Sequence, residues 1–375
     1  FNLTLDTGHF AGADISAGIV GNGTNVGSLT LRDVGTATIS GAINATTAVA
    51  ITDAVTLVDF QGAVTTATLS VPATATAYNV NLTGATGTVT NPVTFANSGS
   101  LTLGQSGGTQ SYNGGLIATA NSSRTLNGTI LTTNDALTLG NVILGSDTTL
   151  DTQASAINVA DLTLGNITGA GFNLTLDTGH FAGADISAGI VGNGTNVGSL
   201  TLRDAGTATI SGAVNATTAV TITDAVTLVD FQGAVTTATL SVPGTATAYN
   251  VNLTGNGTAI TNPVTFANTG SLTLGQSGGT QSYNGGLVAT ANSSRTLNGT
   301  ILTTNDALTL GSVILGSDTT LDTQASAINV ADLTLGNITG AGFNLTLDTG
   351  HFAGADISAG IVGNGTNVGS LTLRD

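Results

Sequence analysis

The chain has 375 residues, of which 40% are apolar, 4% are aromatic and 7% are charged, and its formal net charge is −16. Its acidic residues are all Asp and its 5 basic residues are all Arg, and this scarcity of clustered cations excludes nucleic acids and anionic membrane surfaces as partners. The absence of Cys excludes disulfides and thiolate metal sites, and no apolar run approaches the ~18 residues of a membrane-spanning helix.

Short apolar–polar–apolar triplets recur along the chain, separated by Gly, Asn, Asp, Ser and Thr. Strict alternation with many β-branched residues predicts strands with one face inward, and the separating residues are typical of turns. The first copies of these triplets lie at residues 3–5, 29–31, 49–51, 69–71, 80–82, 101–103, 137–139 and 157–159.

The spacing of the triplets predicts how they stack. Two series advance by about twenty residues: Leu29, Val49 and Leu69, and then Ile117, Leu137 and Ile157. So short a period leaves no room for crossover helices, and we therefore predict an all-β fold. The predicted fold is a right-handed parallel β-helix (β-solenoid) with about 20 residues per coil and roughly 19 coils. A string of immunoglobulin-like sandwiches is the alternative, but it would require larger core residues and hairpin turns.

The sequence also repeats over a much longer distance. The segment FNLTLDTGHFAGADISAG begins at residues 1, 172 and 343, a period of 171. We therefore divide the chain into copy 1 (residues 1–171), copy 2 (172–342) and the start of copy 3 (343–375), within one continuous solenoid. Copies 1 and 2 differ at twelve positions. We expect this window to come from a longer array.

Several strings resemble the repeat regions of filamentous haemagglutinin-type and autotransporter-type surface proteins of Gram-negative bacteria. They are GSLTLRDVGTATISGAINA (27–45), SGSLTLGQSGG (98–108) and ADLTLGNITGAGFNLTLDTG (160–179). The resemblance implies a secreted, extracellular β-helical stalk that serves in attachment, cell-surface coating or the biofilm matrix. We therefore predict a structural fibre or adhesin stalk at the cell surface, whose partners are other copies of itself, joined by coil stacking or by lateral association.

The residues that carry chemistry are few, and we predict no enzyme. His9, with its copies His180 and His351, is the one histidine of the repeat. A catalytic histidine needs an orienting carboxylate and a nucleophile. Asp6 and Asp14 are near in sequence, but Asp-Thr-Gly-His-Phe is typical of a turn at a solenoid corner.

No cofactor is predicted, with calcium as the alternative. Calcium takes six to eight oxygen ligands, whereas paired Asp residues in Thr-rich segments more often bond their own backbone in turns. The candidate carboxylates are Asp147 and Asp151, their copies Asp318 and Asp322, and also Asp53 and Asp59.

Two alternative functions follow from exposed side chains. Repeated aromatic residues would contact surface glycans or receptors on host or neighbouring cells; these candidates are Tyr78, Tyr112, Tyr249 and Tyr283, with Phe10 or Phe60. Columns of Thr-x-Thr would bind ice if they recurred once per coil in register. The motifs begin at Thr36, Thr66 and Thr88.

Overall fold

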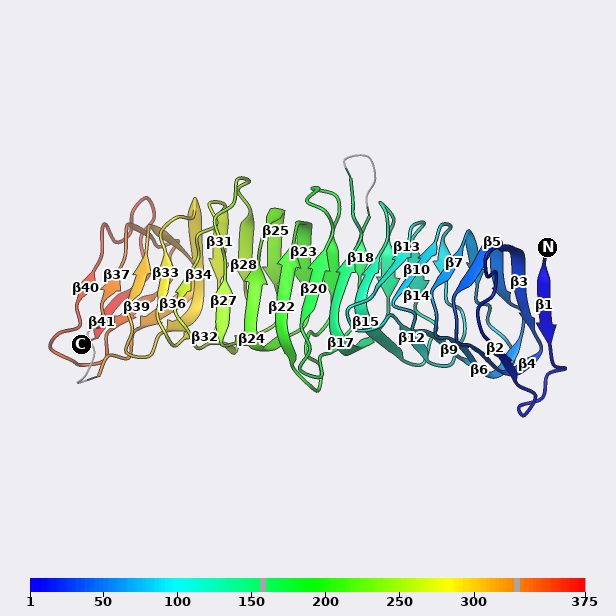
Figure 1. Cartoon of the computed structure of the whole chain (residues 1–375). Coiled ribbons are helices and arrows are strands. Elements are labelled where there is room, and N and C mark those ends of the chain that lie inside the picture. Colours follow the sequence, from blue (N-terminus) through cyan, green and yellow to red (C-terminus); the bar gives the residue numbers. More distant parts are fainter. Residues whose placement is uncertain (156–159, 327–330, 375) are drawn as a thin grey trace. The chain divides into compact units, whose positions relative to one another are not determined.

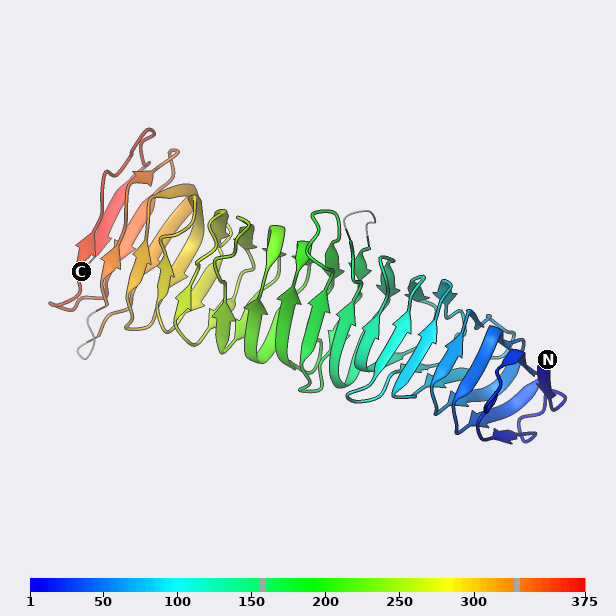
Figure 2. The same cartoon turned by 45° about the horizontal axis from the view of Figure 1, so that its top comes forward.

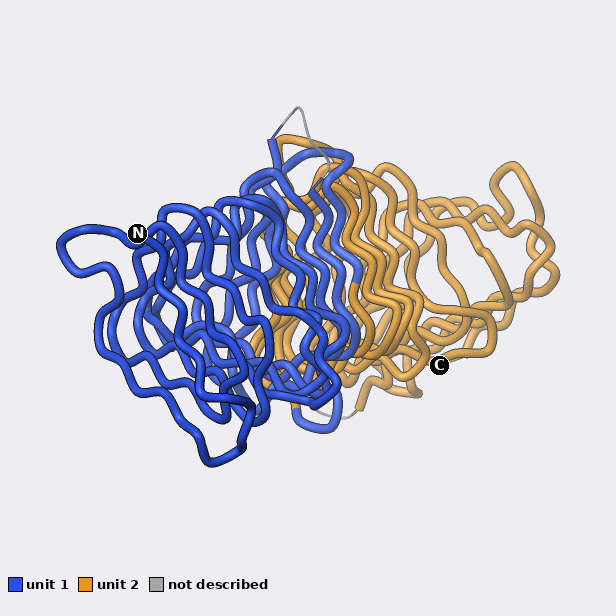
Figure 3. Tube along the Cα trace, turned by 90° about the vertical axis from the view of Figure 1, so that its right-hand side faces the viewer, with its two compact units in different colours: residues 1–187, 193–195 blue, residues 188–192, 196–375 orange. Residues whose placement is uncertain are grey.

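A computed structural model describes residues 1–155, 160–326 and 331–374. The described residues form parallel strands joined by turns, and none of them forms a helix. By their contacts they divide into unit 1 (Phe1–Ser187 with Asn193–Thr195) and unit 2 (Ala188–Gly192 with Asn196–Asp375) (Figure 3). Each unit is a β-solenoid, which confirms the predicted all-β parallel fold.

The strands of unit 1 stack into three columns, which the chain visits in the repeating order 1, 2, 3 after starting at β1 in column 3, and the strands of each column run side by side in Figures 1 and 2. Column 1 contains β2 (Ile15–Ala17), β4 (Val34–Ile39), β6 (Ala54–Phe60), β9 (Asn79–Leu82), β12 (Leu101–Leu103), the first halves of β15 (Arg124–Leu131) and β17 (Val142–Asp151), and β19 (Ile167–Thr168). Column 2 contains the first part of β5 (Ile43–Ile51), β7 (Val64–Thr66), β10 (Thr86–Val89), β13 (Thr109–Tyr112), the second halves of β15 and β17, and β20 (Leu174–Asp177). Column 3 contains β1 (Leu3–Asp6), β3 (Val26–Arg32), the second part of β5, β8 (Thr68–Ser70), β11 (Val93–Thr94), β14 (Leu116–Ala118), β16 (Leu137–Leu139), β18 (Leu162–Thr163) and β21 (Ile186–Ala188).

Unit 2 is built in the same way, and its columns are numbered independently. Column 1 contains β23 (Ala205–Ile210), β25 (Ala225–Phe231), β28 (Asn250–Leu253), β31 (Ser271–Leu274), the first halves of β34 (Ser294–Leu302) and β36 (Val313–Asp322), and β38 (Ile338–Thr339). Column 2 contains the first part of β24 (Val214–Ile222), β26 (Val235–Thr237), β29 (Thr258–Ile260), β32 (Thr280–Tyr283), the second halves of β34 and β36, β39 (Leu345–Asp348) and β41 (Leu371–Arg374). Column 3 contains β22 (Val197–Arg203), the second part of β24, β27 (Thr239–Ser241), β30 (Val264–Thr265), β33 (Leu287–Ala289), β35 (Leu308–Leu310), β37 (Leu333–Thr334) and β40 (Ile357–Ser358).

The turns of the solenoid contain more residues on average than predicted, and their lengths vary because the loops between strands differ in length. Thr125 pairs with Ile143 across a short turn, whereas Thr148 pairs with Leu174 across a distinctly longer one. The described residues make about 17 turns, roughly 22 residues apart. The turns are therefore fewer and longer than the sequence predicted.

The core consists of inward side chains stacked from one turn to the next. Leu29, Val49 and Leu69 pair in register in column 3 of unit 1 and are almost fully buried, as predicted. Phe60 lies between Ile39 below and Leu82 above, and its side chain is also buried. Within a column, an interior strand hydrogen-bonds to the strand of the turn before it and to the strand of the turn after it, as β5 does with β3 and β8. The backbone groups of one turn are therefore satisfied by its neighbours.

One predicted series is wrong by a single residue. Leu116, not Ile117, pairs with Leu137, and Ile117 therefore points outward and is 46% exposed. Because side chains alternate across a strand, a shift of one residue moves an apolar side chain from the core to the surface. The third member, Ile157, lies outside the described residues, as does the triplet at 157–159.

Consecutive copies do not start in the same column. In unit 1, β1 stacks on β3 in column 3, whereas its counterpart β20, one copy later, stacks on β17 in column 2. Likewise β2 lies in column 1 and its counterpart β21 in column 3. From β1 to β21 the chain makes eight turns along column 3. The counterpart of β1 one copy later is β20, which comes one column before β21. One copy therefore spans eight turns less one third of a turn.

Unit 2 shows the same offset independently. Strand β22 lies in column 3, while its counterpart β41 lies in column 2, paired with β39. Val191 forms a bridge to Val214 in column 2, and its counterpart Val362 forms one to Ile338 in column 1. Equivalent residues of successive copies therefore face successive sides of the solenoid, although their sequences are nearly identical.

Candidate functional site

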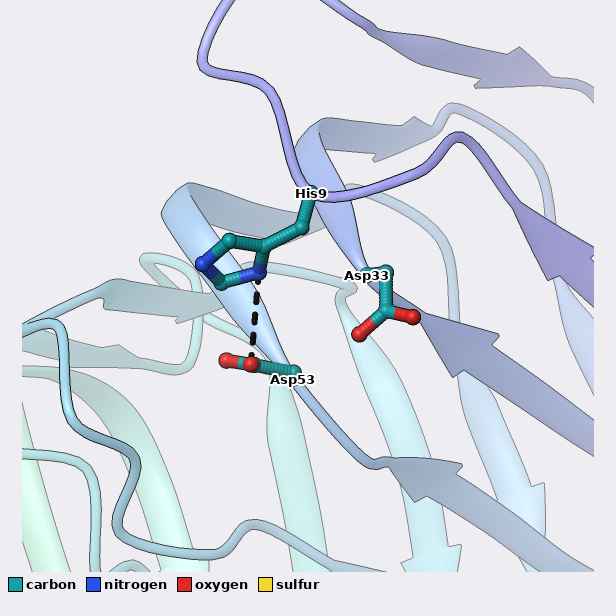
Figure 4. A group of neighbouring side chains, drawn as sticks. All are labelled: His9, Asp33 and Asp53. Atoms are coloured by element: carbon teal, nitrogen blue, oxygen red, sulfur yellow. Dashed lines mark ion pairs between the residues drawn. The ribbon is translucent and has the colours of Figure 1, made fainter.

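A histidine and two aspartates from consecutive turns meet at one edge of unit 1 (Figure 4). One ligand atom from each of His9, Asp33 and Asp53 lies within 4.8 Å of the others. His9 Nδ1 is 3.2 Å from Asp53 Oδ2, with 44% of the His9 side chain and 33% of the Asp53 side chain exposed. The three groups form an open cluster of one imidazole and two carboxylates.

The turn that carries His9 is held in place at several points. Gly8 and His9 adopt left-handed backbone conformations, with φ of 83° and 60°. Asp6 Oδ1 accepts a hydrogen bond from the Gly8 N–H, and Arg32 Nε donates to Asp6 Oδ2 at 2.7 Å. Arg32 thereby holds the pKa of the Asp6 carboxyl below its usual range. The predicted corner turn is confirmed.

The two aspartates are placed by the links between strands. Asp33, between β3 and β4, has a φ of 53°, and its carbonyl accepts bonds from the His9 N–H at 2.6 Å and from Thr7 Oγ1 at 3.1 Å. Asp and His are among the few non-glycine residues that tolerate this region. Asp53 lies between β5 and β6, and its buried Oδ1 atom accepts no hydrogen bond from the described residues.

The sequence alone did not indicate that Asp33 and Asp53 are the partners of His9. Asp6 and Asp14 are nearer to His9 in sequence, but Asp6 pairs with Arg32, and Asp14 Oδ1 accepts from the Thr36 N–H at 3.0 Å. The available signal was the turn period: in a solenoid, residues about one and two turns away from His9 lie above it at the same corner. Asp33 and Asp53 stand at those distances.

The calcium candidates of unit 1 do not converge on one point. Asp147 and Asp151 both project from β17, four residues apart, which places them about 13 Å from each other along the strand. Asp147 accepts hydrogen bonds from the N–H and the side-chain amide of Asn173, at 2.9 and 3.2 Å, and Asp151 accepts one from the Gln153 N–H at 2.8 Å. Asp151 bonds the backbone two residues further along its own chain, as the predicted turn interpretation expected, whereas Asp147 lies within β17 and bonds Asn173 on the next turn of the solenoid.

Their copies in unit 2 behave in the same way. Asp318 accepts from the Asn344 N–H and side chain, and Asp322 from the Gln324 N–H at 2.8 Å. Burial, and then the neighbouring Asp348 carboxylate, raise the pKa of Asp322. In neither unit does the pair form a shared calcium site.

The expectation of exposed tyrosines is wrong. Tyr78, Tyr112, Tyr249 and Tyr283 are at most 2% exposed, because each occupies an inward position where the stack needs a large side chain. Tyr112 packs edge-on against Phe95, and its hydroxyl donates to Gln110 Oε1 at 3.0 Å.

The two phenylalanines of the same hypothesis differ from each other. Phe60 is buried in the core, whereas Phe10 is 73% exposed in the turn that carries His9. Phe10 is thus the exposed member of the candidate set, and its copy Phe181 is 36% exposed, but the four tyrosines do not form the repeated surface contacts that the glycan-binding hypothesis required.

The Thr-x-Thr motifs do not form a single flat array. Thr36 lies on β4 in column 1, and Thr88 lies on β10 in column 2, so they face different sides. Thr66 is buried, and its hydroxyl donates to the Thr68 carbonyl at 3.2 Å. An ice-binding face needs these threonines outward and in register, and this arrangement does not provide it.

Comparison with known proteins adds no relative: no protein-family model, curated protein or solved structure matches the chain. Within the described residues, no helix is long and apolar enough to cross a membrane.

Proposed function

We propose that this chain is a structural segment of a secreted bacterial surface fibre or adhesin stalk, in which further copies of the repeat extend one solenoid. In this role it carries or coats and performs no chemistry of its own. Its partners are copies of itself, stacked turn on turn outside the cell.

The observation that carries the proposal is the offset between copies in each unit. Leu3 and Leu174 lie in columns 3 and 2 of unit 1, and β22 and β41 lie in columns 3 and 2 of unit 2. Any outward feature that occurs once per copy is therefore presented on three sides in turn. A surface that recurs on every side suits a stalk or a coat better than a surface that binds one ligand on one side.

The way that turns are joined supports a mechanical role. Every step within a column is a parallel pairing, so extending the stack satisfies backbone groups that an isolated turn leaves open. Large inward side chains such as Phe60 and Tyr112 are enclosed by neighbouring turns. Stability accumulates along the stack because each added turn contributes its own interface.

Cryo-electron microscopy of longer arrays of this repeat tests the proposal. At ~4.8 Å per turn, one copy should rise about 37 Å, and consecutive copies should be related by a rotation of one third of a revolution. An axial period of about 110 Å, three copies, should therefore dominate. Separate globular beads joined by linkers would rule the proposal out.

A further inference from the structure

The cluster of His9, Asp33 and Asp53 has the donor set of a metal site. It offers an imidazole nitrogen and two carboxylates, with the ligand atoms all within 4.8 Å of one another. Two carboxylates held this close repel each other unless a cation lies between them. The chain, with a net charge of −16, has only 5 arginines to supply such cations.

A second observation comes from Asp53 itself. Its Oδ2 atom faces the His9 imidazole at 3.2 Å, while its Oδ1 atom is buried and accepts no hydrogen bond from the described residues. Buried carboxylate oxygens almost always have a partner, and an unsatisfied one calls for a water or an ion. A cation bound to this carboxylate would reduce its repulsion with Asp33 and would also give the buried oxygen a partner.

The backbone holds the three ligands in position before any ion arrives. The His9 N–H donates to the Asp33 carbonyl, which holds the His9 backbone against the link that carries Asp33. Asp6 and Arg32 hold the base of the same turn through an ion pair of 2.6 Å. Because three consecutive turns each contribute one ligand, an ion would also tie these turns together.

We propose that His9, Asp33 and Asp53 bind a divalent first-row transition-metal ion, with Zn²⁺ as the representative. An imidazole ligand favours zinc, nickel, copper or iron, whereas calcium prefers six to eight oxygens, which this cluster does not offer. Three protein ligands leave coordination positions for water. The proposal is independent of the stalk function, and either one can fail without the other.

The plain alternative is an ion pair between a protonated His9 and Asp53 with no metal. Calorimetric titration of the full chain with Zn²⁺ at about pH 7.5, where an unpaired imidazole is neutral and able to ligate, separates the two. A metal site predicts saturable binding that an excess of Ca²⁺ leaves unchanged. Absence of saturable Zn²⁺ binding up to millimolar concentration, or displacement of Zn²⁺ by equimolar Ca²⁺, would overturn the proposal.

A matched set of variants assigns the ligand. His9→Asn combined with His180→Asn removes the imidazole from both complete copies, and Asn tolerates the left-handed backbone of His9. His351→Asn is the control, because the chain ends before the counterpart of Asp53 in copy 3. The double variant should bind Zn²⁺ at least about tenfold more weakly, and the control should match the parent. Equal affinity in all three proteins would refute His9 as a ligand.

Nuclear magnetic resonance of the unaltered chain gives an answer that does not depend on the folding of any variant. Zn²⁺ should shift the imidazole nitrogen resonances of His9 and leave those of His351 in place. Equal shifts of all three histidines, or none, would contradict a site built from Asp33 and Asp53.

Discussion

Leu3 and Leu174 hold the same place in consecutive copies, yet Leu3 pairs with Leu29 in column 3 of unit 1 and Leu174 pairs with Thr148 in column 2. The long repeat of the sequence and the turn of the solenoid are therefore two separate periods. The fold accommodates this mismatch, because apolar side chains occupy inward positions in all three columns.

Removal of one whole turn should leave the fold intact. Val49 and Leu69 pair on consecutive turns, so deletion of residues 49–68 joins Ala48 to Leu69 and recreates the same local geometry. We expect a circular dichroism spectrum of the same shape and a thermal midpoint close to that of the parent chain, since the remaining turns keep their neighbours.

Deletion of residues 49–58, about half a turn, is the matched control. It joins Ala48 in column 3 to Asp59 in column 1, which places each following strand opposite the wrong partner until the register is lost. This variant should lose much of its β signal or melt far below the parent. Equal behaviour of the two deletions would show that stacking is not organised in columns.

Phe60→Ala should destabilise the solenoid strongly. Its side chain is fully buried between Ile39 and Leu82, and truncation of a buried Phe costs about 3–5 kcal/mol through the lost burial and the cavity left behind. Phe10→Ala is the control, because Phe10 is 73% exposed and its loss should change stability by no more than about 0.5 kcal/mol. Urea unfolding monitored by circular dichroism measures both; a similar midpoint for the two variants would contradict the core described above.

The tyrosines should remain un-ionised until the chain unfolds. Burial raises the pKa of Tyr112 and Tyr283, and burial followed by a nearby aspartate raises that of Tyr78 and Tyr249. Above pH of about 10 the unfolded chain releases phenolic protons that the folded chain retains, so stability is present below that pH and falls as pH rises. Ultraviolet absorbance of the phenolate should appear together with the loss of β signal. Reversible ionisation near pH 10 in the folded chain would mean that the rings are exposed.

Asp322→Asn should preserve or increase stability at neutral pH. Burial and the Asp348 carboxylate raise the pKa of Asp322, so the folded chain holds a proton that the unfolded chain has released at pH values just above about 4. Stability therefore falls as pH rises through that window, and the variant removes this loss. The amide oxygen can still accept the Gln324 N–H bond.

Thermal melts of Asp322→Asn and of the parent, at about pH 4 and about pH 7, should converge at the lower pH, where the parent carboxyl is protonated. Asp322→Ala is the control that also loses the bond from Gln324, and it should be less stable than Asp322→Asn at both pH values. A lower midpoint for Asp322→Asn at neutral pH would indicate that the attraction of Arg374 outweighs the burial and the Asp348 repulsion.

The sequence predicted the class of fold because alternation and spacing are local signals. Leu29, Val49 and Leu69 alternate with polar neighbours and recur at one turn, which was sufficient to predict their stacking. Ile117 was misplaced because Leu116 and Ile117 are both apolar, and neither alternation nor spacing distinguishes which of them points inward.

The candidate site was harder to predict than the fold. The Tyr112 hydroxyl donates a hydrogen bond to Gln110 inside the core, so this tyrosine can be buried. The composition of the chain does not reveal that pairing. His9 meets Asp53 only because two intervening turns have particular lengths, and the length of a turn varies along unit 1. A uniform period of about twenty residues indicates which residues lie near His9, but not which of them contact it.

The offset of one third of a turn also determines how the number of copies affects the direction in which the end of an array points. Every junction between copies is the same, so an array built continuously from them gains or loses whole copies without disturbing the pairing on either side. Each added copy would nevertheless swing the azimuth of everything beyond it by a third of a revolution. Unequal recombination in such a gene would then change the direction in which a distal segment points, as well as its distance from the point of attachment.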